Sequence, residues 1–520
     1  VWSQAGGISM LALAVVLAGC SDPAKSDDGG STSSESESGS GPTESDTQTD
    51  AQTETGDEIP EDAIWIRVEL GAEIAELDER FLSYTLDTLT VVTRQFDFDR
   101  PRLLNLAAEL SPALLRIGGT QADRVFYDLS DLPVSQAPEP YVDVMDRAIW
   151  DPACDFAEAL DLELMFTINA GPGPRDPDGL WTDEQARELI EYTLARDCPV
   201  AVWELGNEPG AFGLEHGLQI EGPEYAVDFA LFDSVVAELD PGARTAAPAV
   251  AYWPLEGEVP KKILPSFLTD AGDRVDVVTW HYYPQQSSSC PIGSRKIDEP
   301  ILPLAWLETV EGWAAEVEGL RDTDAPQAEL WLGETGHAQC EGEPGISNTF
   351  ASSFWWLDQL GRIARRGQPI VIRQALSDFS YSLIEDRGLT PAPDYYASVL
   401  WKRYMGTRVL AASVEGPGTI RAYAHCDAGS PGISIVVVNY SAEASETIAF
   451  LDGRVAFEAA IVTAEQPLAT DVLLNGAPFE ADAEGHVPTP TIAAELGAIT
   501  LPPLSYAFVR LPDADAAACE

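Results

Sequence analysis

From residue 81 to residue 374 the chain repeats one hydrophobic pattern, in which a short apolar run precedes a longer stretch with helical spacing. The short runs predict eight strands, at residues 81–86, 113–117, 162–168, 200–205, 243–249, 275–280, 329–332 and 369–374. Helices that pack on a sheet are predicted between them, among others at residues 183–196, 224–239 and 348–366. Eight strand–helix units in one segment predict an α/β fold, the (β/α)8 TIM barrel.

A different pattern begins after residue 405, where apolar and polar residues alternate in short runs. These runs predict strands with one buried face, at residues 418–425, 433–439, 447–451, 455–463 and 505–511. Residues 63–70 alternate in the same way, although they precede the barrel. We therefore expect a C-terminal antiparallel β-sandwich that this early strand joins. The predicted domains are an N-terminal sandwich strand at 62–78, a barrel at 79–405 and a sandwich at 406–520.

The first 61 residues have the composition of a targeting segment rather than of a folded domain. Residues 8–17 form an apolar run that is too short to span a bilayer as a helix. The run leads into Leu17-Ala18-Gly19-Cys20, which resembles a bacterial lipoprotein signal, although no Lys or Arg precedes it. We expect a signal peptide at 1–20 with lipid on Cys20, then a disordered Ser/Thr/Asp/Glu-rich tether at 21–61. This predicts an exported lipoprotein on the outer membrane or cell surface, which touches the membrane through its N-terminal lipid only.

The charge of the chain narrows the choice of partner. The formal net charge is −56, and residues 21–60 hold 11 acidic residues and one lysine. Residues 61–520 therefore carry −46 of that charge. Such a negative field repels nucleic acid and highly sulfated polyanions, so we expect neither as a partner.

Cysteine usage is typical of an exported protein. Seven cysteines become six once Cys20 is assigned to lipid, and an even number in an exported protein indicates disulfides. Their spacing does not fix which cysteines pair. We propose the pairs Cys154–Cys198, Cys290–Cys340 and Cys426–Cys519. No spacing is typical of a zinc site and the chain has five histidines, so we expect no metal centre and no other cofactor.

Two of the predicted strands end in the same way. The strand at 200–205 stops at a glycine and is followed by Asn207-Glu208-Pro209, while the strand at 329–332 is followed by a glycine and Glu334. Functional groups of (β/α)8 barrels lie at the carboxyl ends of the strands, so both glutamates are expected to face one cleft. Two facing carboxyl groups are the minimum equipment for cleaving a glycosidic bond.

Several stretches resemble, in their order along the chain, one family of glycosidases. They read FLSYTLD (81–87), LRIGGT (115–120), WELGNEP (203–209), VTWHYY (278–283), WLGET (331–335) and RQ (373–374), with LSYAF (504–508) and AAC (517–519) near the C-terminus. The chain resembles glycoside hydrolase family 79, which contains heparanase and related β-glucuronidases, over residues 63–520. The resemblance implies a barrel with a sandwich and a retaining, double-displacement mechanism.

The resemblance also implies roles for individual residues. Glu208 would be the general acid/base and Glu334 the nucleophile, because one carboxyl must arrive protonated and the other ionised. Asn207 would hydrogen-bond the 2-hydroxyl of the sugar. Four further residues would line the same cleft, namely Asp87, Thr120, His281 and Tyr283. By contrast, we expect Glu204 to form a structural ion pair and Arg116 to neutralise a buried acid.

Recognition of a uronic acid needs hydrogen-bond donors for its carboxylate. Tyr381 matches the carboxylate-binding tyrosine of the family, whose other donors are backbone N–H groups of a Gly-rich loop after the nucleophile. Here that loop reads GHAQCEG (336–342), so Cys340 and Glu341 replace two glycines. The backbone donors would be kept if a Cys290–Cys340 disulfide fixes the loop. A Glu341 carboxylate near the bound sugar would repel it unless the side chain points away.

These observations predict a monomeric retaining β-glucuronidase that needs no cofactor. Its substrate would be an oligo- or polysaccharide that contains β-linked glucuronic or 4-O-methylglucuronic acid. The basic clusters with which heparanase grips sulfated chains have no counterpart, so heparan sulfate is not the expected substrate. Two alternatives stay open: a retaining β-glycosidase that acts on a neutral xyloside or glucoside, and an inactive carbohydrate-binding lipoprotein of the cell surface.

Overall fold

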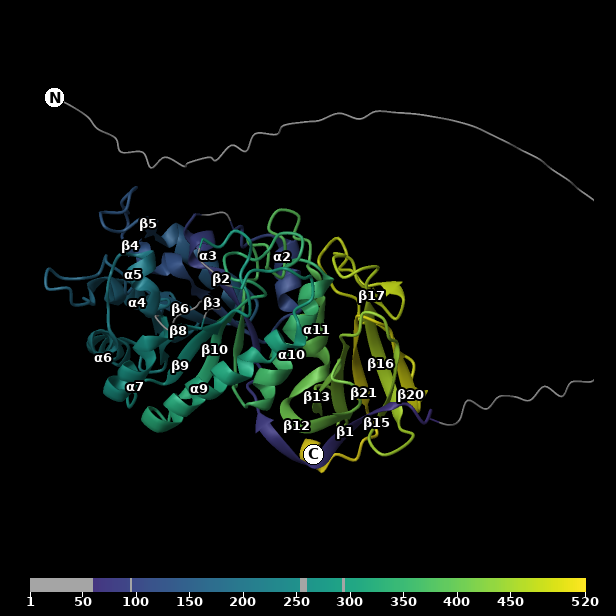
Figure 1. Cartoon of the computed structure of the whole chain (residues 1–520). Coiled ribbons are helices and arrows are strands. Elements are labelled where there is room, and N and C mark those ends of the chain that lie inside the picture. Colours follow the sequence, from purple (N-terminus) through teal and green to yellow (C-terminus); the bar gives the residue numbers. More distant parts are fainter. Residues whose placement is uncertain (1–58, 94–95, 253–259, 292–294) are drawn as a thin grey trace, which may run out of the picture. The chain divides into compact units, whose positions relative to one another are not determined.

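The structure is a computed structural model that describes residues 59–93, 96–252, 260–291 and 295–520 (Figure 1). The predicted signal peptide, Cys20 and all but the last three residues of the predicted tether lie outside the described residues. Within the described part of the chain, no helix is long and apolar enough to cross a membrane.

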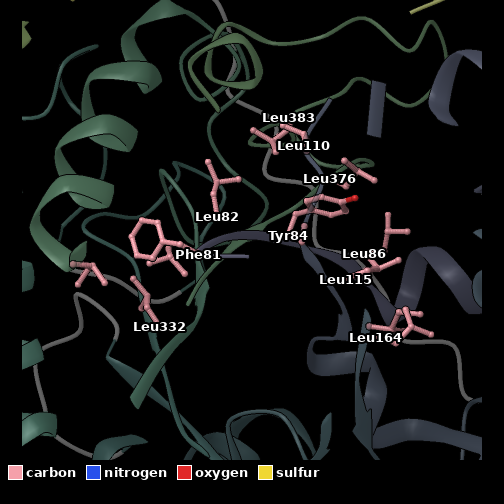
Figure 2. Close-up of a cluster of buried hydrophobic side chains, with 14 of the residues drawn as sticks. Phe81, Leu82, Tyr84, Leu86, Leu110, Leu115, Leu164, Leu332, Leu376 and Leu383 are labelled. Carbon is pink, nitrogen blue, oxygen red and sulfur yellow. The ribbon is translucent and has the colours of Figure 1, made fainter. Parts of the chain in front are cut away.

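Eight parallel strands close into a barrel in the order β10-β11-β2-β3-β6-β7-β8-β9. Their bounds are β2 Leu82–Asp87, β3 Leu114–Gly118, β6 Glu163–Ile168, β7 Val200–Leu205, β8 Arg244–Tyr252, β9 Val277–Tyr282, β10 Glu329–Thr335 and β11 Val371–Gln374. Each strand overlaps one of the eight predicted runs, so the predicted TIM barrel is confirmed. Figure 2 shows Leu86, Leu115 and Leu164, from β2, β3 and β6, together in the large apolar core.

Helices cover the outside of the barrel, as expected when each parallel strand needs a crossover to the next. The α-helices are α1 Thr88–Val92, α2 Pro101–Ala108, α3 Arg147–Ala159, α4 Glu184–Ala195, α5 Phe212–Glu215, α6 Gly222–Leu239, α7 Ile263–Ala271, α8 Leu304–Leu307, α9 Thr309–Asp324, α10 Phe350–Arg365 and α11 Pro393–Tyr404. Short 3-10 helices are η1 Thr120–Arg124, η2 Pro209–Ala211, η3 Pro260–Lys262 and η4 Ala517–Cys519. Two short strands, β4 Val125–Tyr127 and β5 Asp143–Met145, pair with each other beside the barrel.

The remaining strands form one hydrogen-bonded sheet that encloses a second apolar core. They are β1 Ile64–Glu76, β12 Met405–Glu415, β13 Ile420–Asp427, β14 Ile433–Asn439, β15 Glu446–Phe450, β16 Ala456–Thr463, β17 Leu473–Leu474, β18 Ala477–Pro478, β19 Glu495–Leu496, β20 Ala498–Leu501 and β21 Ser505–Leu511. β1 pairs antiparallel with β12 and parallel with β15, so the early strand joins the C-terminal sheet as predicted. The sequence pattern did not reveal β12 or the short strands β17 to β20.

Helix α10 lies between the barrel and the sandwich (Figure 1). Every residue of this helix from Phe350 to Ala364 is buried. Its Asp358 accepts a hydrogen bond from the hydroxyl of Tyr423 in β13 at 2.6 Å, and the backbone oxygen of Phe354 accepts one from Tyr440 at 2.7 Å. The two domains therefore share one apolar core.

Three disulfides join Cys154 to Cys198, Cys290 to Cys340 and Cys426 to Cys519. These are the pairs proposed from the sequence. The first ties α3 to the segment before β7, and the third ties β13 to the C-terminal turn η4. The second fixes the loop after β10, which borders the candidate site described below.

The contact between α10 and the sandwich predicts that alanine at Gly361 lowers the free energy of unfolding, whereas alanine at an unconstrained helical glycine raises it. A Cβ on Gly361 would lie 2.1–2.4 Å from three ring carbons of Tyr423, so Gly361→Ala should lower the free energy of unfolding by about 1–3 kcal/mol through overpacking. In α9, a Cβ on Gly319 would meet no atom within 4 Å, so Gly319→Ala should raise it by about 0.5–1 kcal/mol. Urea unfolding followed by tryptophan fluorescence compares the two variants, and equal shifts would contradict the packing described.

Candidate active site

The two predicted glutamates meet at the carboxyl ends of the barrel strands. Glu208 follows β7, and Glu334 is the next-to-last residue of β10. Side-chain ligand atoms of Glu208, Glu334 and His281 all lie within 4.8 Å of one another. Glu208 has a left-handed backbone (φ 54°, ψ 52°), a strained conformation that non-glycine residues keep mainly at functional sites. The two carboxyl groups therefore face each other at the barrel mouth.

Glu334 is held in a fixed orientation by two donors. The hydroxyl of Tyr283 donates to its Oε1 at 2.7 Å, and Nη1 of Arg116 donates to its Oε2 at 2.9 Å. Burial by itself would raise the pKa of Glu334, but the influence of His281 and Arg116, with the hydrogen bonds from Tyr283 and Arg116, outweighs it and lowers this pKa. Glu334 is therefore the ionised member of the pair, which is the state that a nucleophile needs.

Glu208 has a different neighbour. Its Oε1 lies 2.9 Å from Nδ1 of His281, whose side chain is fully buried. A protonated carboxyl group donates to this nitrogen, and an ionised one accepts a hydrogen from it. The contact therefore accommodates both protonation states through which a general acid/base passes.

Beneath the two glutamates lies a buried network around Arg116 and Glu204. The guanidinium of Arg116 donates to Oε2 of Glu204 through Nε at 3.0 Å and Nη2 at 2.8 Å. Thr167 and Thr279 donate to the same carboxylate at 2.8 and 3.0 Å. The structural ion pair expected for Glu204 is confirmed. The sequence did not predict that Arg116 also reaches Glu334.

Asn207 is positioned by the same network. Nη2 of Arg116 donates to its side-chain oxygen at 2.9 Å, and its backbone N–H donates to Oδ2 of Asp123 at 2.8 Å. Asp123 also accepts the backbone N–H of Ala170 at 2.8 Å. Burial raises the pKa of Asp123 to about 7, so this carboxyl changes charge near neutral pH.

The cleft above the pair has about 280 Å³ of free space. Nine of the ten residues predicted for the site line it: Asp87, Thr120, Asn207, Glu208, Tyr283, Glu334, Cys340, Glu341 and Tyr381. The tenth, His281, is fully buried, and its Nδ1 lies 2.9 Å from Oε1 of Glu208 and 3.8 Å from Oε2 of Glu334. Further lining residues that the sequence did not single out are Leu89, Gly119, Gln121, Glu215, Gln339, Gln374 and Phe379.

Asp87 contributes a third carboxyl group from the end of β2. It caps α1 by accepting the backbone N–H of Leu89 at 2.9 Å, and Gln374 donates to its other oxygen at 3.1 Å. Burial raises the pKa of Asp87 to about 7, and the nearby charge of Glu334 adds to the shift. Asp87 is thus able to donate a hydrogen bond to a sugar hydroxyl below neutral pH.

The loop after β10 keeps the backbone shape of a glycine-rich turn. Cys340 and Glu341 have positive φ angles of 63° and 67°, and Gly342 follows at 79°. The disulfide from Cys340 to Cys290 holds this loop, and a side chain on Gly342 would lie 2.7 Å from the backbone nitrogen of Tyr381. The Glu341 side chain is exposed, whereas Tyr381 is buried and its pKa is raised by that burial, so its hydroxyl stays protonated.

Glu208, His281 and Glu334 also have the residue types that bind metal ions. However, Arg116 already donates to Glu334 at 2.9 Å, and a guanidinium at this distance repels a cation. The arrangement therefore suits proton transfer better than metal binding.

Removal of Arg116 should be costly because it leaves two carboxylates without their shared partner. Arg116→Leu is expected to lower the free energy of unfolding by about 3–5 kcal/mol, the usual result of breaking a buried ion pair. Arg274→Leu provides the control, since Arg274 is half exposed and its pair with Asp233 spans 3.5 Å. That exposed pair is worth at most about 1 kcal/mol. Urea unfolding measures both variants, and a similar small loss in each would show that Arg116 does not stabilise the site.

Comparison with known proteins agrees with this geometry. The family described as "Glycosyl hydrolase family 79, N-terminal domain" matches residues 66–361. The heparanase of Gallus gallus is 31% identical over 412 residues, which cover 69% of this chain and 76% of that protein. The protein named "Inactive heparanase-2" of Homo sapiens is 25% identical over 533 residues, which cover 86% of this chain and 88% of that protein.

Solved structures share the fold. The α-L-arabinofuranosidase from Thermotoga maritima, solved as an arabinose complex, superposes with a TM-score of 0.65 at 16% identity, over 86% of this chain and 99% of that one. The family match at residues 66–361 covers more than half of the chain, and the match to the Gallus gallus heparanase covers 69% of it. The resemblance seen in the sequence is therefore confirmed, and the chain belongs to glycosyl hydrolase family 79.

Proposed function

We propose that the protein is a retaining glycoside hydrolase that releases β-linked glucuronic or 4-O-methylglucuronic acid from an oligo- or polysaccharide. The observation that carries the proposal is the approach of the Glu208 and Glu334 carboxyl oxygens to within 4.8 Å. Retaining enzymes place their carboxyl groups about 5–5.5 Å apart, whereas inverting enzymes leave about 6.5–9.5 Å for a water molecule.

The reaction proceeds in two displacements. Glu334, kept ionised by its neighbours, attacks the anomeric carbon while Glu208 gives its proton to the departing glycosidic oxygen. This forms an ester between the sugar and Glu334. Glu208, now a carboxylate, takes a proton from a water molecule that attacks the same carbon, and the Glu334 carboxylate is released. Two inversions at one carbon retain its configuration.

Neighbouring residues prepare these steps. Tyr283 and Arg116 hold the two oxygens of Glu334, so the attacking carboxylate loses little orientational freedom in the transition state. Asn207 lies between Arg116 and the cleft and is assigned to the sugar 2-hydroxyl. A hydrogen bond there strengthens as positive charge develops on the ring.

Two features support a uronic acid as the substrate. Tyr381 offers a protonated hydroxyl at the cleft, where it can donate to a carboxylate. Cys340 and Glu341 adopt the positive φ angles that glycines adopt readily, so the backbone of the altered loop keeps the shape of its Gly-rich counterpart. We assign the uronate carboxylate to Tyr381 and this loop.

One feature favours the neutral-sugar alternative. Glu341 lines the cleft as a carboxyl group, and like charges at close range repel. A retaining β-xylosidase or β-glucosidase would avoid that repulsion. Binding of a uronic acid requires the exposed Glu341 side chain to turn toward solvent.

Hydrolysis of an aryl β-glucuronide tests the proposal directly. We expect turnover by the unaltered protein and a loss of at least roughly 10⁴-fold in kcat for Glu334→Gln, as in enzymes that lose a nucleophile. Glu208→Gln should lose roughly 10²–10⁴-fold with a poor leaving group and less with a nitrophenolate, which departs without a proton. Released nitrophenol is followed by absorbance.

Matched aryl glycosides separate the alternatives. Faster turnover of the aryl xyloside or glucoside than of the glucuronide would assign the protein to neutral sugars. Absence of turnover on all three, with sugar binding intact in the unaltered protein and in Glu334→Gln, would support the inactive binding protein.

We also propose that the protein works as an exported lipoprotein anchored through Cys20. The lipoprotein-like sequence around Cys20 and the three disulfides, which form in oxidising compartments, support this location. Cys20→Ala should move the protein from the membrane fraction of an expressing bacterium to the soluble fraction, whereas Ser21→Ala should not. Immunoblots of the fractions measure the change, and a Cys20→Ala protein that stays with the membrane would exclude a lipid anchor at this residue.

A further inference from the structure

A second carboxyl group on the acid/base side of the cleft has no role in the mechanism above. Glu215 ends α5, seven residues beyond Glu208 on the same connection between β7 and α6, and it lines the cleft. Its Oε2 is buried and has no hydrogen-bond partner among the described residues. The other oxygen, Oε1, does not belong to the buried polar atoms that lack a hydrogen-bond partner, and a fifth of the side chain is exposed. Glu215 thus presents Oε1 to the cleft.

The neighbouring histidine determines which oxygen of Glu215 can act as a donor. The side chain of His216 is 99% buried, and its Nδ1 accepts a hydrogen bond from Nε of Arg124 at 3.2 Å. Arginine donates only, so the hydrogen of the neutral imidazole must sit on Nε2. That nitrogen is also buried without a partner, and it lies 3.9 Å from Oε2 of Glu215.

The charge state of both groups follows from their surroundings. Burial and then the charge of Arg124 lower the pKa of His216 to about 4, so the ring is neutral at pH 7. Burial, followed by the nearby Glu208, raises the pKa of Glu215 to about 9, so this carboxyl keeps its proton. The positive end of the His216 N–H lies nearest to Oε2, because Nε2 and Oε2 are 3.9 Å apart. This favours Oε2 as the carbonyl oxygen and leaves Oε1 to carry the hydrogen.

From this geometry we infer that Glu215 binds the leaving-group side of the substrate, as a hydrogen-bond donor to a hydroxyl of a neutral sugar. Glu215 lines the cleft, and the charge of Glu208 acts on it more strongly than the charge of Glu334 does, so Glu215 lies nearer the acid/base. The acid/base faces the oxygen that leaves, and we therefore place Glu215 beside the sugar attached to that oxygen. A sulfated sugar is a poor fit, because the nearby cation Arg124 already donates through Nε to His216 and through Nη2 to the backbone oxygen of Glu215. The inference rests on the proposed hydrolysis of a glycan.

The test compares two kinds of substrate that share their glucuronic acid. One is 4-nitrophenyl β-glucuronide, whose leaving group has no sugar hydroxyls, and the other is a panel of β-glucuronosyl disaccharides with an unsulfated leaving sugar. Glu215→Ala should lower kcat/KM for the best disaccharide by about tenfold, the factor expected for one lost hydrogen bond. The aryl substrate should change by less than about twofold, since it has no partner for that hydrogen bond.

Two further variants sharpen the comparison. Glu215→Gln should stay within about threefold of the unaltered protein on both substrates, because the amide can turn its oxygen to His216 and its NH₂ to the cleft. Glu191→Ala, an equal change of side chain at an exposed position of α4, should alter neither rate. Where Glu215→Ala does not fold, Glu215→Asp replaces it, since the shortened acid keeps its hydrogen but withdraws it from the cleft.

Each outcome has one meaning. Equal losses on both substrates, or none on either, would overturn the inference and leave Glu215 as a structural group beside His216. Cleavage of the aryl glucuronide without cleavage of any disaccharide would also overturn it, because a sugar-binding residue would then have nothing to bind. If the unaltered protein hydrolyses neither kind of substrate, the result would instead contradict the proposed β-glucuronidase function.

Discussion

The active site depends on one buried guanidinium that serves two carboxylates. Arg116 reaches from β3 to Glu204 on β7 and to Glu334 on β10, so a single cation links three strands across the barrel. One positive charge between two negative ones leaves the cluster with an excess of negative charge. Hydroxyl groups of Thr167, Thr279 and Tyr283 offset that excess by donating to the carboxylates. The contacts of Arg116 and Tyr283 orient the oxygens of Glu334 and lower its pKa, so structural support and the charge state of the proposed nucleophile come from one set of interactions.

The sequence pattern was sufficient to predict the barrel and the meeting of Glu208 and Glu334 at its mouth. The eight apolar runs form strands because both faces of a parallel barrel strand are buried, so that such a strand consists mainly of apolar residues. Glu208 and Glu334 were identifiable because each follows an apolar run that stops at glycine, although β10 continues through Glu334 to Thr335. The topology brings all strand ends to one mouth. The alternation in residues 63–70 was sufficient to predict that this strand joins the sandwich, whereas its parallel pairing with β15 was not predicted.

Other features depend on contacts between distant segments, which no local pattern encodes. The hydrogen bond from Arg116 to Glu334 joins residues 218 positions apart, and the sequence around either residue does not indicate it. The sequence does not distinguish Glu215 from the other acidic residues of the chain, because its burial beside His216 depends on the fold. The backbone of Cys340 and Glu341 was doubtful from sequence, since these residue types disfavour positive φ. The disulfide at Cys340 and the packing of Tyr381 on Gly342 account for the shape that the residue types alone did not predict.

The position of β1 has a consequence for the order in which the molecule can be assembled. This strand pairs with β12 through Trp65 and Glu415, so its partner is synthesised only after the whole barrel. Ile64 and Ile66, which are buried in the sandwich core, therefore cannot reach their final partners until some 340 further residues of chain are available. Contacts of such long sequence separation form late, because the intervening loop must close first. The sandwich is therefore expected to form last. Until it forms, the unpaired β1 strand is the segment that most favours aggregation.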